Sequence, residues 1–479
     1  VRLHACARSE ARAEEILRRL AAAYQVFDLT SGNQFAAWPL PATARPGDLG
    51  PLPGSAAALL NVREISGLWH MPVGEALERV RRQTYERVLP VSAQEVMHLD
   101  GAPVGVSRKG EHRVAVDLPA EALNRNGFVI GMTQQGKTTL MEHLAARLMQ
   151  DYDRSLLVVD PHGDMARRLA GLVPRERVGD VIYIDLADER QAVGLNLLDV
   201  SDGASPETVA ETFVDVGKAL WEDYWGPRMV VPLSYGLKAL AIANQARPPE
   251  RQLTILDLPT LLTCNADTRD AFLDSALPAE DPRAKSVLLY FQGEYNNLSA
   301  SQREQIIQPV LSKARAFSRT AAIERVVGQP RSTLRLFEAI RSRKIIILNT
   351  NAGLIGDDLA GFIGSLFLNM MRRVIMQQTE LAREERVRVT VIADEFQKMA
   401  GVDFPGMLGE LQKYGGTLWL GTQALDNLRR SDESGAVVGS IFAGVATRVV
   451  FRTNGEDARY LIDRELDVAR LRAESLTNL

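Results

Sequence analysis

Residues 128–139 have the sequence FVIGMTQQGKTT, which is the most informative segment of the chain for its fold. It opens with apolar residues typical of a buried strand, and from Gly131 it matches the pattern G-x-x-x-x-G-K-[ST]. The next segment repeats apolar side chains at helical spacing: Leu140, Met141, Leu144 and Leu148. Strand, glycine-bearing turn and helix in this order predict a phosphate-binding loop, because backbone N–H groups then meet an anion at the helix N-terminus.

The residue types in this loop (the Walker A pattern) suit a nucleoside triphosphate. The two glycines let the backbone turn its N–H groups toward the phosphates. Lys137 supplies a positive charge to the β and γ phosphates, and the Thr138 hydroxyl is a ligand for Mg²⁺. We therefore expect ATP and Mg²⁺ as cofactors. The predicted nucleotide-binding residues are Gly131, Thr133, Gln134, Gln135, Gly136, Lys137, Thr138 and Thr139.

A second apolar run, residues 391–393, ends in the carboxylates Asp394 and Glu395 (a Walker B pattern). We interpret Asp394 as the second Mg²⁺ ligand, through the water shell of the ion. Glu395 is then the catalytic base that orients and polarises the attacking water. The alternative is an exposed Asp-Glu pair that caps the next element. The phosphate-binding loop favours the catalytic interpretation.

A third run, residues 417–420, is followed by Thr422 and Gln423. Ligands of open parallel sheets bind at the carboxyl ends of strands, so Gln423 is a candidate sensor of the γ phosphate. An ordinary loop amide is the alternative interpretation.

Short apolar runs alternate with helical patterns over most of the chain, which predicts an α/β fold with a mainly parallel, doubly wound sheet. The expected strands cover residues 128–130, 156–159, 181–184, 345–348, 389–393, 417–420 and 449–451.

Three regions follow from these patterns. Residues 1–113 are expected to form a small mixed α/β domain, with a Gly/Pro-rich linker at 31–55. Residues 114–479 are expected to form the main α/β domain. Within it, residues 206–334 lack strand patterns and predict an all-helical insertion, with Ser205 as the N-cap of its first helix.

Composition limits the class of protein only loosely. The net charge of −4 and the pI of about 6.0 do not indicate a dedicated nucleic-acid-binding protein. They do not exclude one, because a DNA channel needs only a few local Lys and Arg residues. Cys6 and Cys264 have no partner spacing and are expected to be structural thiols in a reducing compartment. No uninterrupted apolar run reaches membrane-spanning length, so we expect no membrane segment in this chain and any anchor upstream of it.

The phosphate-binding loop, LLVVDPHGD at 156–164, VIADEF at 391–396 and LGTQ at 420–423 together resemble the HerA/FtsK superfamily of ring ATPases. Within it the chain is most similar to the conjugative coupling proteins of type IV secretion (TraG/TraD-like). NVREISGLWHMP at 61–72 resembles a segment ahead of the loop in those proteins.

This resemblance implies a RecA-like P-loop NTPase fold and an ATP-driven DNA-translocating motor. It also implies a hexameric ring with DNA through its centre, and a relaxase and secretion channel proteins as partners. The expected location is cytoplasmic, at the inner face of the cell membrane, through an upstream anchor absent from this chain.

Ring motors of this class complete each ATP site with an arginine from the neighbouring subunit. Gln412 and Lys413 stand where coupling proteins often show that arginine. Arg228, in WGPRM at 225–229, resembles another element of the family and is the first candidate for this catalytic role. Arg448 and Arg452 are the alternatives. In the family the DPHGD element lies close to the nucleotide, but Asp160 and His162 equally suit an ordinary turn.

Three further functions stay open. A HerA-like cytosolic DNA translocase working with a nuclease would share the core but carry an N-terminal β-barrel, and residues 1–113 look too helical for one. A secretion-machine ATPase would hydrolyse ATP without binding DNA. A nucleotide-dependent switch would bind ATP without turnover, and Glu395 argues against it because a switch does not need a strong base.

Overall fold

A computed structural model describes residues 7, 9–24, 101–109, 112–190, 193–200, 203–221, 226–431 and 435–465. The chain divides into two compact units, residues 1–88 and 89–479. In the first unit the described helix is α1 (Glu10–Tyr24), where Glu15 forms ion pairs with Arg12 and Arg19. Cys6, the predicted linker at 31–55 and the NVREISGLWHMP segment lie outside the described residues.

The second unit is built on a seven-stranded sheet in which every pairing is parallel. Its strands lie in the order β5-β6-β4-β7-β8-β3-β9. Each predicted apolar run coincides with a strand, so the predicted α/β fold class is confirmed. The strands are β3 (Gly127–Ile130), β4 (Arg154–Asp160), β5 (Val181–Asp185), β6 (Ile345–Asn349), β7 (Arg388–Ala393), β8 (Gly416–Thr422) and β9 (Thr447–Val450).

The strand order places the three functional segments side by side. Strand β8 lies between β3, which leads into the phosphate-binding loop, and β7, which leads into the acid pair. Ile130 pairs with Thr422 and Ala393 pairs with Leu420, so the three strands end at one edge of the sheet. All side chains that follow these strands therefore emerge at the same edge.

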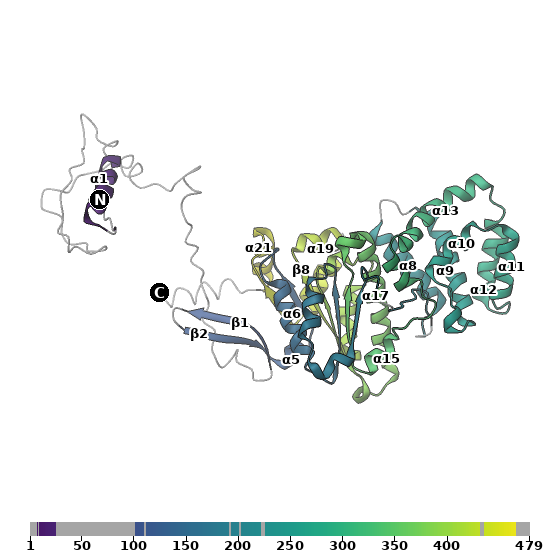
Figure 1. The fold of residues 1–479 in the computed structure, drawn as a ribbon, viewed down its shortest axis with the longest axis horizontal. Helices are drawn as coiled ribbons and strands as arrows, with labels where there is room; N and C mark the ends of the chain where they lie inside the picture. The colour runs from purple at the N-terminus through teal and green to yellow at the C-terminus, as the bar shows by residue number, and fades with distance from the viewer. Residues whose placement is uncertain are drawn as a thin grey trace. The chain divides into compact units, whose positions relative to one another are not determined.

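Each face of the sheet packs into its own hydrophobic core, because successive strand residues point to opposite faces. On one face lie α6 (Lys137–Leu148) and α7 (Asp164–Leu172), and on the other α17 (Asp357–Gln377), α18 (Phe404–Glu410) and α20 (Ala436–Gly444). Figure 1 shows α6 and α17 on opposite sides of the strands. The remaining short helices include α5 (Ala120–Leu123), α16 (Ala352–Ile355), α19 (Leu425–Ser431) and α21 (Gly455–Glu465).

Helix α17 is long and strongly apolar. The span Asp357–Glu380 is long and apolar enough to cross a membrane, but 72% of its apolar stretch is buried inside the fold. Burial to this extent is what the central helix of a packed core shows.

An antiparallel hairpin, β1 (Ala102–Lys109) and β2 (His112–Leu118), precedes the sheet in the second unit. Ala102 is fully buried against α6, and Arg147 of that helix donates to the Gly101 carbonyl at 3.3 Å. The domain limits at 113, 206 and 334 stay predictions.

Between β5 and β6, every element that the structure describes is a helix. Ser205 caps the first of these helices as predicted, because its hydroxyl accepts the Thr208 N–H at 3.1 Å. The described α-helices and the π-helix are α8 (Pro206–Leu220), α9 (Pro227–Gln245), α10 (Leu258–Thr263), α11 (Ala266–Ala276), α12 (Pro282–Leu288), the π-helix η6 (Leu289–Tyr295), α13 (Ala300–Ala314), α14 (Ala321–Val327) and α15 (Leu336–Arg341).

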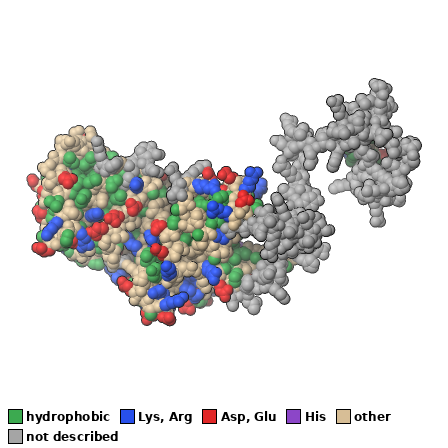
Figure 2. Space-filling model, turned by 180° about the vertical axis from the view of Figure 1, so that it is seen from behind, with side chains coloured by type: hydrophobic (Ala, Val, Ile, Leu, Met, Phe, Trp, Pro, Cys, Tyr) green, Lys and Arg blue, Asp and Glu red, His purple; other side chains and the backbone are tan. Residues whose placement is uncertain are grey.

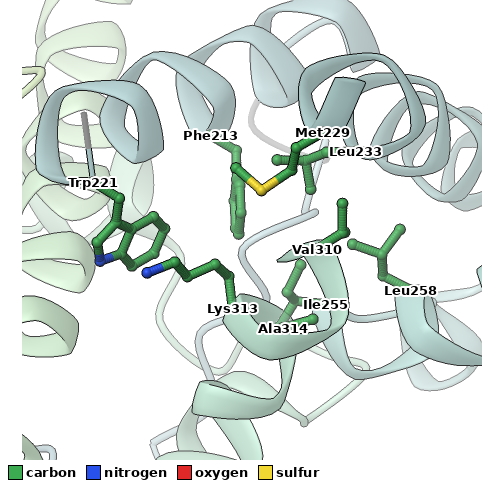
Figure 3. Close-up of a pocket in the computed structure, with 9 residues that line it drawn as sticks. All are labelled: Phe213, Trp221, Met229, Leu233, Ile255, Leu258, Val310, Lys313 and Ala314. Carbon is green, nitrogen blue, oxygen red and sulfur yellow. The ribbon is translucent and has the colours of Figure 1, made fainter. Parts of the chain in front are cut away.

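Aromatic side chains join this helical segment to the sheet domain. Trp221 stacks on Phe362 of α17 with ring centroids 4.9 Å apart. Figure 3 shows the neighbouring hollow, where Lys313 reaches toward Trp221 with its ammonium 4.4 Å from the ring centre. The cavity measures about 10 Å³ and has no room for a nucleotide. A nucleotide must therefore bind elsewhere, and the strand order points to the carboxyl edge of the sheet.

Candidate nucleotide-binding and hydrolysis site

The phosphate-binding loop connects β3 to α6 and depends on its glycines. Gly136 has a φ of +100°, a left-handed conformation that glycine adopts without strain. At Gly131 an added Cβ would lie 2.6 Å from the Cβ of Phe451, so no larger residue fits. The loop is anchored by the Gly131 and Met132 N–H groups, which donate to the carbonyls of Thr422 and Arg452. The first turn of α6 then presents N–H groups that lack intrahelical partners.

Lys137 lies between the two carboxylates predicted from the distant acid pair. Its ammonium donates to Asp394 Oδ1 and, at 2.8 Å, to Glu395 Oε1. All three side chains are about 6% exposed. The structure thus brings together two motifs that are 258 positions apart in the chain.

The predicted metal ligands are also neighbours. The Thr138 hydroxyl donates to Asp394 Oδ2 at 2.9 Å. Gly421 on β8 leaves the space that Asp394 needs, because a Cβ there would lie 2.8 Å from Asp394 Oδ1. A hydroxyl and a carboxylate beside a phosphate-binding loop form the oxygen donor set that Mg²⁺ prefers. These residues therefore fit the predicted ion.

Glu395 is held by several groups at once. Its backbone is left-handed, with φ 49° and ψ 40°, which is uncommon for a residue other than glycine. Besides Lys137, Gln423 donates to Oε1 at 2.8 Å and Gln397 donates to Oε2 at 2.5 Å. These contacts fix the direction of the carboxylate.

The charges of the buried pair stabilise each other. Burial alone would lower the pKa of Lys137, but the attraction of Asp394 and Glu395 outweighs it, so the pKa is raised. Burial alone would raise the pKa of Glu395, but the Lys137 charge and the hydrogen bonds from Lys137, Gln423 and Gln397 lower it overall. Lys137 and Glu395 therefore form a charged pair near neutral pH.

Gln423 links the catalytic-base candidate to the loop. While its amide nitrogen donates to Glu395, its Oε1 accepts the Thr133 hydroxyl at 3.3 Å. The side chains of Thr133, Gln134, Gln135 and Thr139 are exposed. The nucleotide-binding role of these four residues stays a prediction.

The candidate arginines occupy different settings. Arg228 is in the first turn of α9, and its side chain lies outside the described residues. Arg448 donates to the Phe442 carbonyl at 2.7 Å and lies over the Phe442 ring, so it holds α20. Arg452 has an exposed side chain, and its carbonyl accepts the Met132 N–H beside the loop.

The Asp-Pro-His-Gly-Asp element forms a turn at the end of β4. Asp160 is buried, and its two oxygens accept the N–H groups of His162 and Ala166 at 2.9 Å each. Asp160 therefore fixes the turn that starts α7, while the His162 side chain is exposed.

Two residues of the site were not predicted from the sequence. Phe451 closes over Gly131 from the end of β9, and Gln397 contacts the candidate base. The apolar run 449–451 contained the first, but only the strand order shows that it meets the loop. No sequence signal marks Gln397, because its contact depends on the left-handed turn at Glu395.

Fold and site together have the architecture of a RecA-like P-loop nucleoside triphosphatase. The solved structures to which the chain is similar include the bacterial conjugative coupling protein TrwBdeltaN70, at 18% identity and a TM-score of 0.51, over 80% of this chain and 82% of that one. This likeness shows a shared fold. No family model and no curated protein sequence matches the chain.

Two further structures are more distant. TrwB in complex with ADP and Mg²⁺ is 16% identical, with a TM-score of 0.43 over 68% of this chain and 71% of that one. VirB4 of Thermoanaerobacter pseudethanolicus is 14% identical, with a TM-score of 0.47 over 77% of this chain and 89% of that one.

Proposed function

We propose that this chain is an ATPase that drives the transfer of DNA or nucleoprotein in conjugative type IV secretion. The observation that carries the ATPase assignment is the convergence of Lys137, Asp394 and Glu395 within hydrogen-bonding distance at the carboxyl edge of the sheet. A structural ion pair would not require a glycine-bearing loop on one side and a second carboxylate on the other.

Each residue then has a distinct chemical task. Lys137 leaves the acid pair to contact the β and γ phosphates, and the loop N–H groups bind the remaining phosphate oxygens. Thr138 and Asp394 would hold Mg²⁺, which neutralises the phosphate charge when bound.

Glu395 acts on the attacking water. It accepts a proton from that water while the water oxygen bonds to the terminal phosphorus and the bond to the ADP oxygen breaks. The products are ADP and inorganic phosphate. Gln423, which contacts both Glu395 and Thr133, senses the γ phosphate and couples its presence to the base.

The transport part of the proposal is supported by the fold shared with TrwB, which is described as a conjugative coupling protein. We infer a hexameric ring with DNA in its central channel, acting at the inner face of the cell membrane with a relaxase and secretion channel proteins. Figure 2 shows Lys and Arg side chains interspersed with Asp and Glu on the visible face of the molecule. DNA contacts are accordingly expected to be local and to lie within the ring.

ATP turnover and nucleotide binding of three variants test the ATPase assignment. Glu395→Gln should bind ATP at least as tightly as the parent, while turnover falls by about 10²–10⁴-fold because the proton acceptor is lost. Lys137→Ala should weaken ATP binding itself. Lys398→Ala is the control, since it removes only an ion pair to Asp357 at the surface. Comparable turnover in Glu395→Gln and the parent would refute the role given to Glu395.

The same turnover assay separates the remaining functions when single- or double-stranded DNA is added. A DNA motor should show stimulated hydrolysis, and a secretion ATPase that does not bind DNA should show none. The two outcomes leave the assignment of the ATP site untouched.

A further inference from the structure

The carboxylate of Glu395 is turned toward Lys137 and is held there from both sides. Its Oε1 accepts Lys137 and Gln423 at 2.8 Å each, and its Oε2 accepts Gln397 Nε2 at 2.5 Å. The ammonium it faces is the one that the proposed function assigns to the phosphates. In this arrangement the carboxylate and the phosphates compete for the same cation.

Gln397 does not suit its surroundings as a packing residue. Its Oε1 is buried, and no residue that the structure describes donates a hydrogen bond to it. Burying an unpaired amide oxygen costs free energy, which an apolar side chain of similar shape would avoid. Gln397 borders a cavity of about 40 Å³ that has both polar and apolar walls. Its lining includes Phe396, Met399, Val402, Phe404, Leu428 and Val437. Packing against these apolar side chains therefore does not account for a glutamine at this position.

The position of Gln397 connects the base to helix α19. It belongs to the short helix η10 (Phe396–Lys398), which follows the left-handed residue Glu395 directly. Leu428 of α19 lines the same cavity, and α19 begins two residues after Gln423. Both amides that hold Glu395 are thus carried by segments that meet at one cavity.

We propose that Gln397 is a positioning residue that holds Glu395 on Lys137 while the site contains no nucleotide. When Lys137 turns to the phosphates and Gln397 releases Oε2, the carboxylate becomes free to orient water. This inference rests on the proposed function, because it assigns a resting state to the same site.

Gln397→Met tests the proposal, with Gln397→Leu as a second variant. ATP and the non-hydrolysable analogue ADPNP should each bind roughly tenfold more tightly, because the carboxylate loses a donor that helps it to compete for Lys137. The unfolding temperature should change little, because the loss of the hydrogen bond to Glu395 and the removal of the unpaired buried oxygen act in opposite directions.

The pH dependence of turnover provides a readout that a packing role would not change. The hydrogen bond from Gln397 helps to lower the pKa of Glu395, together with the bonds from Lys137 and Gln423. In Gln397→Met the acidic limb of the kcat/KM profile, which reports the nucleotide-free site, should therefore move to higher pH, whereas the acidic limb of the kcat profile should stay in place. Lys137 and Asp394, the charged groups that face Glu395, are unchanged in this variant.

Gln150→Met is the matched control, because Gln150 is exposed at the end of α6 and away from the acid pair. It should leave both affinity and pH profile unchanged. Unchanged or weaker ADPNP binding in a folded Gln397→Met or Gln397→Leu variant would overturn the proposal. ADPNP binding does not depend on hydrolysis. If the parent bound no nucleotide, the proposed function would fail; if it bound nucleotide equally with and without Gln397, only this inference would fail.

Discussion

At the scale of single residues, the buried pair of Lys137 and Glu395 makes the stability of the nucleotide-free chain depend on pH. The pKa of Glu395 is lowered in the folded state, so its contribution is present above the ordinary value of about 4.5 and is lost as pH falls through the lowered pKa. The pKa of Lys137 is raised, so its contribution is present below about 10.5 and is lost as pH rises through the raised pKa.

Denaturant unfolding of the parent and of Glu395→Gln over a pH series measures this effect. Near neutral pH the parent should be more stable by about 1–3 kcal/mol, because the charge-assisted bond to Lys137 is lost in the variant. The difference should shrink as pH falls below 4.5. Glu384→Gln, at an exposed position, should not change the profile. A difference that stays constant from neutral to acidic pH would contradict the pairing.

The motif residues of the site could be predicted from the sequence because their order along the chain is specific for a phosphate-binding site. The lysine of the loop and the two acids each follow an apolar strand, and parallel strands end at one edge. Gln397 could not be predicted, because the left-handed backbone at Glu395 decides where its amide points. The part played by Arg228 stays a prediction.

At the scale of elements, the phosphate-binding loop is expected to reject a side chain at Gly131. In Gly131→Ala the new Cβ would lie 2.6 Å from the Cβ of Phe451, and rotation of the ring cannot relieve this contact. The variant should lose about 1–3 kcal/mol of stability and bind ATP more weakly. Gly171→Ala in α7 is the control: its Cβ meets no atom within 4 Å, and it should be neutral or slightly stabilising. Thermal unfolding and ATP titration of both variants measure the contrast, and equal effects would contradict it.

Seven strands were predictable because each is apolar at successive positions, as a strand covered on both faces must be. Their order was not predictable. Nothing in the run 417–420 shows that β8 inserts between β3 and β7, and this placement brings Gln423 to Glu395. The hairpin of β1 and β2 was also not predicted, because apolar and polar residues alternate only weakly over residues 102–118.

At the scale of the whole molecule, the proposed ring requires that one chain complete the ATP site of the next. None of the described side chains places an arginine on the acid pair: Arg448 is bonded to α20, and the Arg452 side chain is exposed. In the proposed ring the cation that stabilises the transferring phosphoryl comes from a neighbouring chain, and Arg228 is our first candidate.

Mixing two inactive variants tests this arrangement. Arg228→Ala and Glu395→Gln should each hydrolyse ATP poorly alone. A mixture of the two variants can form intact sites. Such a site takes Glu395 from an Arg228→Ala chain and Arg228 from the Glu395→Gln chain next to it. Random assembly of equal amounts should restore about a quarter of the parental rate, because a head-to-tail ring pairs two different surfaces at every interface. Arg452→Ala in place of Arg228→Ala separates the two candidates. A mixture no more active than its components would show that the arginine acts within its own chain or not at all.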